Sequence, residues 1–553
     1  MGKKKQKKSV GASRKMAKMP KKRGAEKSEQ KSEKQAGAQA ARAADGSSAA
    51  PAIWAPLGLS IFSAVLSFLA FPGFDVWPLA FICLVPLFFA LDWSPRLTNK
   101  QVILCAIAFG FTGMWGGYYW VVNVLQDFSG FPLVLCLFLA SLLNLAQGGM
   151  LALMAWLYHR LRGRGWWPIL AAPAAHAASE FIYPMLFPYY YANHLHDLPL
   201  LIQTADLGGP LLVTTFVSAF NVGVYHLVRP LVMKEPWHKK QIAIAAAVTV
   251  FTVGYGAYRM AEVDARAAES PAITVAMPQV SMGIFEKREN PYLGVQKHID
   301  MSLEAEREVD PDLLIWPESA FTFFLPDGIT NVKQHVMGPV STPLLFGGLQ
   351  RRTVDGIERH YNTAFMVDGD GEVQGTFDKT YLLAFGEYLP FGEEFPVFYE
   401  WSPHSGHFTA GNHVEALPFG DFRITALICY EDIMPGFVRD AVNQADPHLL
   451  VNITNDAWFG ETSEPWQHLA LAKFRAVEHH RYLVRSTNSG VSAIIDPAGR
   501  VVANTGIFTE ETLTGEVHMM TGTTVYQYLG DWPGWLALAA CIYLGWFRRR
   551  GTV

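Results

Sequence analysis

Long apolar segments alternate with short polar ones over the first half of the chain, and this pattern changes near residue 260. Segments of this length are typical of membrane-spanning helices, which need about 20 mainly apolar residues. Pro72, Gly73 and Pro78 interrupt the first two, which we expect to form a helical hairpin that barely crosses. The eight segments cover residues 53–71, 76–92, 102–124, 131–157, 166–187, 210–228, 241–258 and 533–547.

The basic residues predict the orientation of these spans. Lys and Arg occur before the first span, in every second connection and after the last span, whereas residues 73–75, 126–132 and 188–210 contain none. Because cytoplasmic loops are enriched in Lys and Arg, both termini are expected in the cytoplasm. Seven spans then place residues 259–532 on the opposite side of the membrane.

Composition supports a membrane protein that carries a soluble part. Half of the 553 residues are hydrophobic and only 17% are charged. Residues 1–50 hold fifteen Lys and Arg against four acidic residues and no aromatic residue, which predicts a disordered basic cytoplasmic tail. No apolar core that could make it a signal peptide lies within it. No aromatic or folded motif accompanies its charge, so nucleic-acid binding is not expected.

Between residues 270 and 520 short buried strands alternate with helices, which predicts an α/β domain. The helical patterns cover residues 295–308 and 466–482. The strands are expected at residues 272–277, 312–316, 344–348, 424–429, 448–454 and 491–495.

One cysteine stands out in this domain. An apolar run over residues 422–428 leads directly to Cys429, where the chain turns polar. Taken alone, a free cysteine is more often a small buried hydrophobic residue than a nucleophile. The other four, Cys83, Cys105, Cys136 and Cys541, lie in apolar spans, so Cys429 has no disulfide partner in its domain. An unpaired cysteine in an oxidising compartment suggests a reactive thiol.

Two other strand ends supply groups that could assist a thiol. Glu318 follows a buried strand, and Lys379 precedes a loop that contains Glu387. A carboxylate can take the thiol proton, and an ammonium can stabilise the oxyanion of an acyl-transfer intermediate. Each of these residues alone is more often a surface charge. The prediction that they assist the thiol therefore depends on their joint occurrence.

Histidines offer a weaker alternative as bases. None follows a strand into a turn as Cys429 does, and His479 and His480 are expected on the exposed face of a helix. The histidines of the domain include His360, His468, His479 and His480.

These residues also carry a resemblance. Trp316–Ser319, Lys379 with Phe385–Glu387, and Ile428–Glu431 resemble the Glu-Lys-Cys motifs of the nitrilase, or carbon–nitrogen hydrolase, superfamily. With Asn452–Gly460, Trp466–His468 and Arg485–Gly490, and with seven spans before the domain and one after it, residues 53–547 resemble the apolipoprotein N-acyltransferase family of Gram-negative bacteria.

The resemblance implies a polytopic bundle of eight transmembrane helices with an inserted αββα sandwich in the bacterial inner membrane. Residues 1–50 would be the cytoplasmic tail and 51–260 the seven-helix region. Residues 268–520 would form the periplasmic nitrilase-like catalytic domain, and 530–548 the final transmembrane helix.

The resemblance also implies the reaction. Cys429 would take an acyl chain from a phospholipid, typically phosphatidylethanolamine, as a thioester. The α-amino group of a diacylglyceryl-cysteine at the N-terminus of an apolipoprotein would then accept it. Glu318 would be the base and Lys379 the oxyanion stabiliser. Glu387, Tyr430, Glu431, Asn455 and Trp458 would support the reaction or line the site, and neither a metal nor an organic cofactor is implied.

Two positions depart from the family pattern, and they concern the loops around the site. Ala384 stands where Pro usually precedes the Phe-Gly-Glu sequence. Phe285 is the only aromatic residue near the place of a usual tryptophan, for which it could substitute.

The aromatic segment 391–408, with Trp401 among its members, is either ordinary core or a lid at the membrane interface, and we favour the lid. Tyr189, Tyr190 and Tyr191 would face it from the bundle.

Three functions remain to be separated: the acyl transfer described above and two alternatives. A membrane-anchored amidase would use the same three residues but discharge its thioester with water, and the eight spans favour transfer instead. A transporter or receptor is a second alternative, although the spans hold few ionisable residues apart from Glu180, Asp197 and Asp206.

Overall fold

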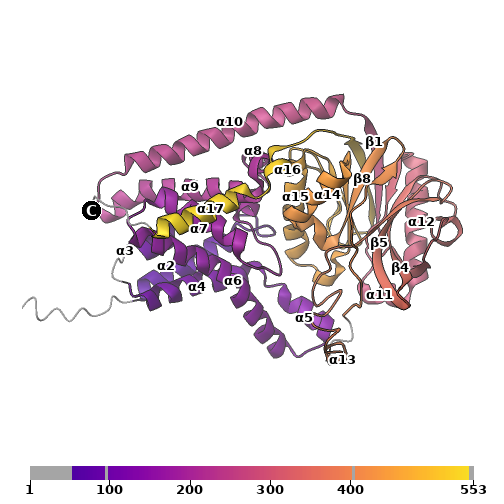
Figure 1. Ribbon diagram of the computed structural model, residues 1–553, viewed down its shortest axis with the longest axis horizontal. Coiled ribbons are helices and arrows are strands. Elements are labelled where there is room, and N and C mark those ends of the chain that lie inside the picture. Colours follow the sequence, from indigo (N-terminus) through magenta and orange to yellow (C-terminus); the bar gives the residue numbers. More distant parts are fainter. Residues whose placement is uncertain (1–52, 94–96, 402–404, 547–553) are drawn as a thin grey trace, which may run out of the picture. The chain divides into compact units, whose positions relative to one another are not determined.

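The computed structural model describes residues 53–93, 97–401 and 405–546 (Figure 1). The tail predicted for residues 1–50 lies outside them. Each predicted apolar segment contains a helix or a pair of helices. These are α2 (Trp54–Leu69), the 3-10 helix η1 (Trp77–Phe81) with α3 (Val85–Trp93), α4 (Asn99–Gly117) with α5 (Val121–Ser129), α6 (Leu133–Gly163), α7 (Pro168–Ile182), α9 (Ala205–Met233), α10 (Lys239–Glu269) and α17 (Trp532–Trp546).

The lengths of these helices limit how many cross a membrane alone. Among the described residues α6, α9 and α10 are long and apolar enough, and the α4–α5 pair, bent by 58°, adds a fourth if it is one span. Shorter apolar helices cover Trp54–Leu69, Trp77–Asp92 and Trp532–Gly545. At about 1.5 Å per residue these helices are shorter than a hydrocarbon core of about 30 Å. The count of eight crossings therefore stays a prediction.

Two glycines bring α4 and α6 into backbone contact. A Cβ atom at Gly110 would lie 2.0 Å from the carbonyl oxygen of Gly148, and one at Gly148 would lie 2.7 Å from the carbonyl carbon of Gly110. Small residues at such crossings are the usual way in which membrane helices pack closely.

The α/β domain contains two sheets. The first has the order β13–β1–β2–β4–β5–β6, with β3 paired to β4, and the second has the order β12–β11–β10–β9–β8–β7. The strands of the first are β1 (Ala272–Gln279), β2 (Leu313–Ile315), β3 (Phe321–Pro326), β4 (Leu344–Val354), β5 (Ile357–Val367), β6 (Val373–Asp378) and β13 (Glu511–His518). Those of the second are β7 (Leu417–Phe419), β8 (Phe422–Ile428), β9 (Leu449–Thr454), β10 (Leu483–Thr487), β11 (Ala493–Ile495) and β12 (Val501–Asn504).

The two sheets form a sandwich that positions the candidate residues. One apolar cluster joins Val275 and Ile315 of the first sheet to Ile428 and Ile453 of the second. Helix α12 (Pro291–Glu308) packs on the first sheet, and α14 (Pro435–Ala445) and α15 (Glu464–His479) pack on the second (Figure 1). The pairs β1–β2, β2–β4, β8–β9 and β9–β10 are parallel. Their carboxyl ends therefore share one edge in each sheet.

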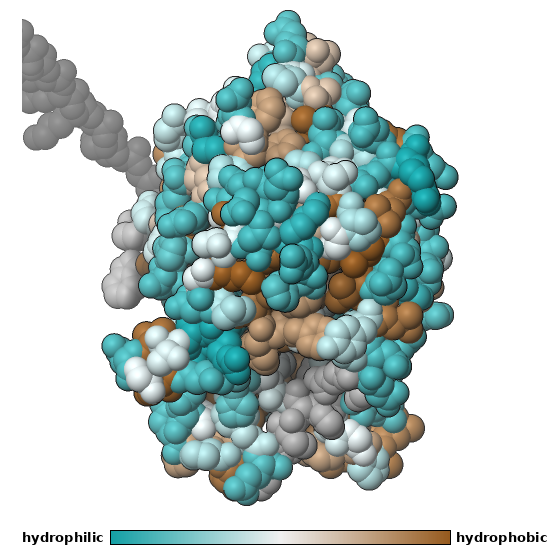
Figure 2. All heavy atoms as spheres, turned by 90° about the vertical axis from the view of Figure 1, so that its right-hand side faces the viewer, coloured by the Kyte–Doolittle hydropathy of each residue, from teal (hydrophilic) through white to brown (hydrophobic). Residues whose placement is uncertain are grey.

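The outer surfaces of the helical bundle and of the α/β domain differ. On α6 the large apolar side chains of Leu133, Val134 and Phe138 are more than half exposed, as expected for a helix that faces lipid. Figure 2 views the molecule from its α/β end, and that face is mostly hydrophilic with a few hydrophobic strips.

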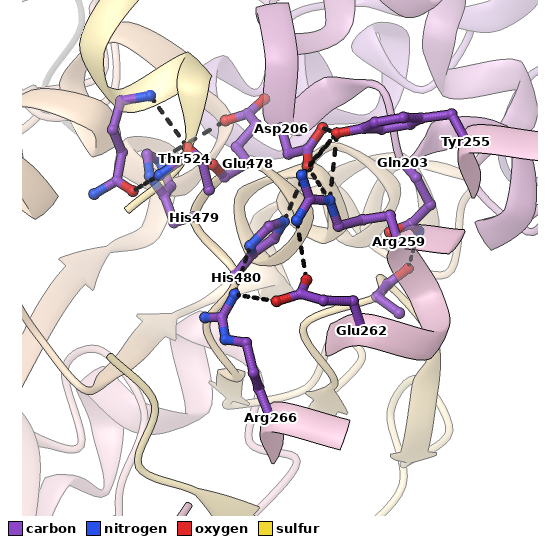
Figure 3. A network of polar contacts seen from close by, with 12 residues as sticks. Gln203, Asp206, Tyr255, Arg259, Glu262, Arg266, Glu478, His479, His480 and Thr524 are labelled. Atoms are coloured by element: carbon purple, nitrogen blue, oxygen red, sulfur yellow. Dashed lines mark hydrogen bonds and ion pairs between the residues drawn. The ribbon is translucent and has the colours of Figure 1, made fainter. Parts of the chain in front are cut away.

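A polar network joins the α/β domain to α9 and α10 (Figure 3). The carboxylate of Asp206 on α9 accepts a hydrogen bond from the Tyr255 hydroxyl at 2.8 Å and lies 2.8 Å from Arg259 Nε, both on α10. His480, which follows α15, lies 3.2 Å from Asp206 and 3.3 Å from Arg266. This network holds the end of α15 against both helices.

The prediction that His479 and His480 occupy an exposed helix face is wrong. Their exposed fractions are 0% and 2%, because α15 lies between the second sheet and α9. The polar side of α15 is covered by contacts with the rest of the protein. Its amphipathic pattern therefore does not indicate a surface helix.

Candidate active site

The three predicted principal residues all follow strands of the sandwich. Glu318 comes after β2, and Lys379 and Cys429 directly follow β6 and β8. Glu318 and Lys379 are buried rather than on the surface, and Lys379 Nζ lies 3.3 Å from Glu318 Oε1. The structure thus brings this carboxylate and ammonium into direct contact.

A second carboxylate and an amide complete this cluster. Lys379 Nζ lies 2.8 Å from Glu387 Oε1, and the Glu387 Oε2 atom accepts the backbone N–H of Leu383 at 2.8 Å. The side-chain amide of Asn362 donates to Glu318 at 2.7 Å and to Glu387 at 3.2 Å. Asn362 lies on β5, a strand that the sequence pattern did not indicate. Its amide is a donor shared by the two carboxylates and holds both in place.

The electrostatics of this cluster keep Lys379 charged. Burial opposes the charge, but Glu318 and Glu387 outweigh it, so the pKa of Lys379 is raised well above its ordinary value. A permanently charged ammonium is suited to stabilise negative charge and unsuited to accept a proton at neutral pH.

Cys429 occupies an uncommon backbone conformation. Its φ of +53° lies in the left-handed region, at the point where β8 turns into the 3-10 helix η4 (Cys429–Ile433). Burial raises the pKa of the Cys429 thiol well above its ordinary value; Glu318 adds to this effect and Lys379 opposes it. The resting thiol is therefore protonated and needs a base before it can attack.

Glu431 ties the cysteine turn to the lysine loop. One carboxylate oxygen accepts the backbone N–H groups of Thr380 and Tyr381 at 2.6 and 3.0 Å, and the other accepts that of Ile428 at 2.8 Å. Burial raises the pKa of Glu431 to about 7, although these hydrogen bonds oppose the shift. Glu431 is fully buried and faces no open space.

A buried ionic network, which the sequence pattern did not indicate, lies behind the cysteine turn. Arg485 on β10 contacts Asp432 at 2.7 Å and Asp456 at 2.9 Å, and His468 bonds the same two carboxylates at 2.8 and 3.1 Å. Asp432 and Asp456 follow β8 and β9, and His468 lies on α15. The network therefore ties the ends of neighbouring strands to the helix that covers them.

Asn452 connects this network to the cysteine. It accepts a hydrogen bond from Arg485 at 2.8 Å and donates to the carbonyl of Cys429 at 3.2 Å. Burial and Arg485 oppose the charge on His468, but Asp432 and Asp456 outweigh them and raise its pKa to about 10.

Two groups of metal-ligand type occur among the described residues. Asp456, Glu464 and His468 form one, and Asp75, His196 and Asp197 form the other. Arg485 already pairs with Asp456, and His196 and Lys473 already pair with Asp197. Arg485 and Lys473 thus already contact one group each.

The remaining predicted residues surround this core. The hydroxyl of Tyr430 donates to the carbonyl of Leu186, in the connection after α7. Asn455 is buried and accepts the N–H of Ala457 at 3.3 Å, and Trp458 packs against the apolar core of the bundle. The side chains of Phe285 on α11 (Ile284–Glu289) and Trp401 on α13 (Val397–Trp401) lie outside the described residues.

Lys287 is a further buried cation beside the cluster. Its Nζ atom lies 3.4 Å from the carbonyl of Ser319, and burial lowers its pKa to about 7 against the effect of Glu318. Its position in a run of charged residues gave no sign of burial.

The aromatic segment is only partly as predicted. Phe391 and Phe395 are 70% and 56% exposed, so these two are not core residues. Tyr189 and Tyr191, predicted to face this segment, instead belong to the core of the bundle. The hydroxyl of Tyr191 donates to the carbonyl of Ala80, which holds the ring inside.

The membrane helices contact the α/β domain close to these residues. Trp120 donates to the side chain of Gln467 at 3.0 Å, and Gln467 donates to the carbonyl of Gly117 at 2.8 Å. A Cβ atom at Gly73 would lie 2.5 Å from that of Ser463. The end of α4 and the residues just after α2 thus lie directly against the start of α15 and the residue before it.

The sandwich, with a cysteine beside a paired lysine and carboxylate at its strand ends, defines a nitrilase-like domain. Residues 274–526 match the carbon-nitrogen hydrolase family, and residues 63–223 match the apolipoprotein N-acyltransferase N-terminal domain. The chain belongs to the apolipoprotein N-acyltransferase family and is a membrane-associated acyltransferase.

Relatives cover nearly the whole chain. The apolipoprotein N-acyltransferase of Rhodopseudomonas palustris is 30% identical over 533 residues, which are 90% of this chain and 96% of that protein. That of Geobacter metallireducens is 29% identical over 504 residues, which are 89% and 95% of the two chains. A solved structure, Nit3 of Saccharomyces cerevisiae from the nitrilase superfamily, shares 17% identity, covers 47% of this chain and 93% of its own, and has a TM-score of 0.35.

Proposed function

We propose that this acyltransferase moves an acyl chain from a phospholipid to the α-amino group of the N-terminal diacylglyceryl-cysteine of an apolipoprotein, through a thioester on Cys429. The single observation that carries the mechanism is the ammonium of Lys379, held between Glu318 and Glu387 next to the cysteine turn.

In the first half-reaction Glu318 accepts the proton of the Cys429 thiol, and the sulfur attacks the carbonyl carbon of a phospholipid ester. The charge that develops on the carbonyl oxygen is stabilised by Lys379. Collapse of this intermediate breaks the ester C–O bond. Glu318 returns the proton to the departing oxygen, which releases a lysophospholipid and leaves the acyl chain on sulfur.

In the second half-reaction the acceptor amine attacks the thioester carbon. Glu318 takes one proton from the nitrogen, Lys379 again stabilises the oxyanion, and the C–S bond breaks. The proton on Glu318 returns to the sulfur, which restores the Cys429 thiol and releases an amide. No net proton or electron is gained or lost by the protein over the cycle.

The supporting residues hold the reacting groups in position. Glu387 and Asn362 hold Lys379 and Glu318, while Glu431 holds the Cys429 turn against the loop that follows Lys379. Tyr430 ties the same turn to the membrane helices. Asn455, Trp458, Phe285 and Trp401 are proposed to line the path of the substrates.

A phospholipid donor, with phosphatidylethanolamine as the expected species, fits the position of the site. The contacts of Gln467 with Trp120 and Gly117 support a site that opens beside the bundle. The exposed rings of Phe391 and Phe395 support a lid at the membrane interface, where aromatic side chains concentrate. Each CH₂ group that need not pass through water saves about 0.8 kcal/mol.

We further propose the topology and domain limits that the sequence indicates. Eight helices cross the bacterial inner membrane, with residues 51–260 as the seven-helix region and 530–548 as the last span. Residues 268–520 form the catalytic domain in the periplasm, and both termini, including the tail of residues 1–50, are cytoplasmic. The basic connections at one end of the helices support this orientation.

Mass spectrometry of the intact protein tests this function. After incubation with phosphatidylethanolamine, the protein should gain the mass of one acyl chain, labile to hydroxylamine, and Cys429→Ala should gain none. A diacylated lipopeptide should then remove the chain and become an amide. Protein that stays unmodified while lipid is consumed would overturn the thioester. Acyl-enzyme that only water discharges would instead identify a membrane-anchored amidase.

A further inference from the structure

A cavity of about 550 Å³ lies at the end of the bundle away from the α/β domain. It is formed by the last turns of α6 and by α17 (Figure 1). Its lining residues are Trp156, Leu157, Arg160, Leu161, Arg164, Cys541, Ile542 and Gly545. None of them belongs to the acyl-transfer site described above.

The polar part of the lining is cationic. Arg160 lies on the last turn of α6 and Arg164 is the residue that follows its end, four positions on, so both lie on one side of the helix; Arg160 is exposed and Arg164 is half-buried. Among the described residues neither has an ion-pair partner. Arg162 differs, because its Nε atom lies 3.0 Å from the buried carboxylate of Asp92. The cavity therefore contains two guanidinium groups whose charge the surrounding protein does not balance.

The rest of the lining is apolar and open to the outside of the bundle. Trp156 and Ile542 are 38% and 64% exposed, although both lie on apolar helices. From Trp156 to Arg164 the cavity follows α6 over about 12 Å. A ligand that fits this lining has an anionic head and an apolar body.

We infer that this cavity binds one anionic phospholipid, whose phosphate is held by Arg160 and Arg164 and whose acyl chain lies along Trp156 and Ile542. A bidentate contact between guanidinium and phosphate is among the strongest polar interactions in proteins. Basic pockets between helices are recognised sites for anionic head groups. A soluble anion would leave the apolar walls uncovered, and a zwitterionic lipid would bring a further positive charge to two uncompensated arginines.

The sequence and the packing add to this argument. The chain continues from α17 into Arg548, Arg549 and Arg550, within five residues of Gly545. The indole N–H of Trp166 donates to the carbonyl of Leu544 at 2.7 Å, so α17 is already fastened to the α6–α7 turn here. A lipid in the cavity would join α6 to α17, the helix that follows the catalytic domain in the chain.

Native mass spectrometry of the full-length protein in detergent tests the site, with dialkyl ether phosphatidylglycerol as the probe. An ether lipid has no ester carbonyl, so it cannot acylate Cys429. We expect one retained lipid per chain, bound at least about tenfold more weakly by Arg160→Ala/Arg164→Ala. Dialkyl ether phosphatidylcholine should be retained at least about tenfold more weakly than the phosphatidylglycerol.

Two further variants keep the test specific. Lys239→Ala/Lys240→Ala removes the same charge from exposed positions at the same end of the bundle, outside the cavity, and should bind as the parent does. A Cβ atom at Gly545 meets nothing within 4 Å, so Gly545→Phe can fill the cavity without a backbone clash and should also lose the lipid. Equal binding by the parent and both cavity variants, equal loss in the lysine control, or equal retention of phosphatidylcholine would each overturn the inference.

Discussion

The ammonium of Lys379 lies closer to Glu387, at 2.8 Å, than to Glu318, at 3.3 Å. Glu387 also accepts the backbone N–H of Leu383, which fixes its second oxygen. Glu318 has no such backbone anchor among the described contacts, and it is therefore the carboxylate with more freedom to exchange a proton. This difference supports the proposed roles, in which Glu387 holds Lys379 and Glu318 exchanges the proton.

Replacing Glu387 by Gln should separate these two roles. The change removes one of the carboxylates that raise the pKa of Lys379, so this pKa should fall and the alkaline limit of activity should move to lower pH. We expect kcat/KM to fall about 10²-fold at neutral pH. The pH profile of acyl transfer measures both effects. The exposed Glu393, changed to Gln, is the control, and an unchanged alkaline limit in Glu387→Gln would contradict the argument.

Asn362 should matter for activity although it carries no charge. Its amide donates to both carboxylates, so Asn362→Ala removes a shared donor and leaves Lys379 as the remaining contact between the mutually repelling Glu318 and Glu387. We expect acyl transfer to slow by about 10-fold or more, which corresponds to the loss of one or two buried hydrogen bonds. Asn362→Asp should be worse, because it adds a third carboxylate.

The rate of Cys429 acylation, measured by intact-protein mass spectrometry, reports this effect directly. The exposed Asn504, changed to Ala, should leave the rate as it is. Acylation of Asn362→Ala at the parental rate would show that Lys379 alone keeps the two carboxylates in place.

Glu431 should make stability depend on pH between its ordinary pKa near 4.5 and the raised value of about 7. A carboxyl with a raised folded pKa binds its proton more tightly in the folded state. Its contribution is therefore fully present below about pH 4.5 and is lost as the pH rises through 7. Glu431→Gln should flatten this part of the profile. It should also cost about 1–3 kcal/mol, since its NH₂ group must face a backbone N–H.

Thermal unfolding at pH 5 and pH 8 tests this expectation. Glu304→Gln, on the exposed side of α12, is the matched control and should keep the parental difference in Tm between the two pH values. If Glu431→Gln keeps that difference as well, another group causes it.

The sequence indicated those parts of the fold that depend on local patterns. Apolar runs predicted the membrane helices and β1, β2, β4, β8, β9 and β11, because buried strands are short continuous apolar runs. Strand β5 escaped notice because its first residues, Glu358, Arg359 and His360, are polar and at least partly exposed. Asn362 follows them on the same strand, so the residue that joins the two carboxylates was missed with it.

Residues whose environment comes from distant parts of the chain were also missed. Arg485 is fully buried on β10, and its partners Asp432 and Asp456 lie 53 and 29 residues away in sequence. A charged residue directly after the apolar Leu483 and Val484 was the available signal. The burial of His480 depends on Asp206 of α9, 274 residues away, and no local pattern contains that contact.

The buried network behind Cys429 should give stability a second, alkaline dependence on pH through His468. The folded pKa of His468 is raised to about 10, above its ordinary value of 6.5. The stability that its charge contributes is therefore fully present below about pH 6.5 and is lost as the pH rises through 10. His468→Gln removes this charge and leaves Asp432 and Asp456 to Arg485 alone. Breaking a buried ion pair costs about 3–5 kcal/mol, so Tm at pH 6 should fall by about 5–15 °C.

The decisive comparison is the difference in Tm between pH 6 and pH 10, which should be smaller in His468→Gln than in the parent. His413→Gln is the control, because His413 is 61% exposed. Asn452 joins this network to the carbonyl of Cys429, so the variant should also acylate more slowly at pH 6. A variant that loses stability but acylates at the parental rate would show that the cysteine turn keeps its conformation without the network. An unchanged Tm difference would show that His468 is neutral in the folded protein.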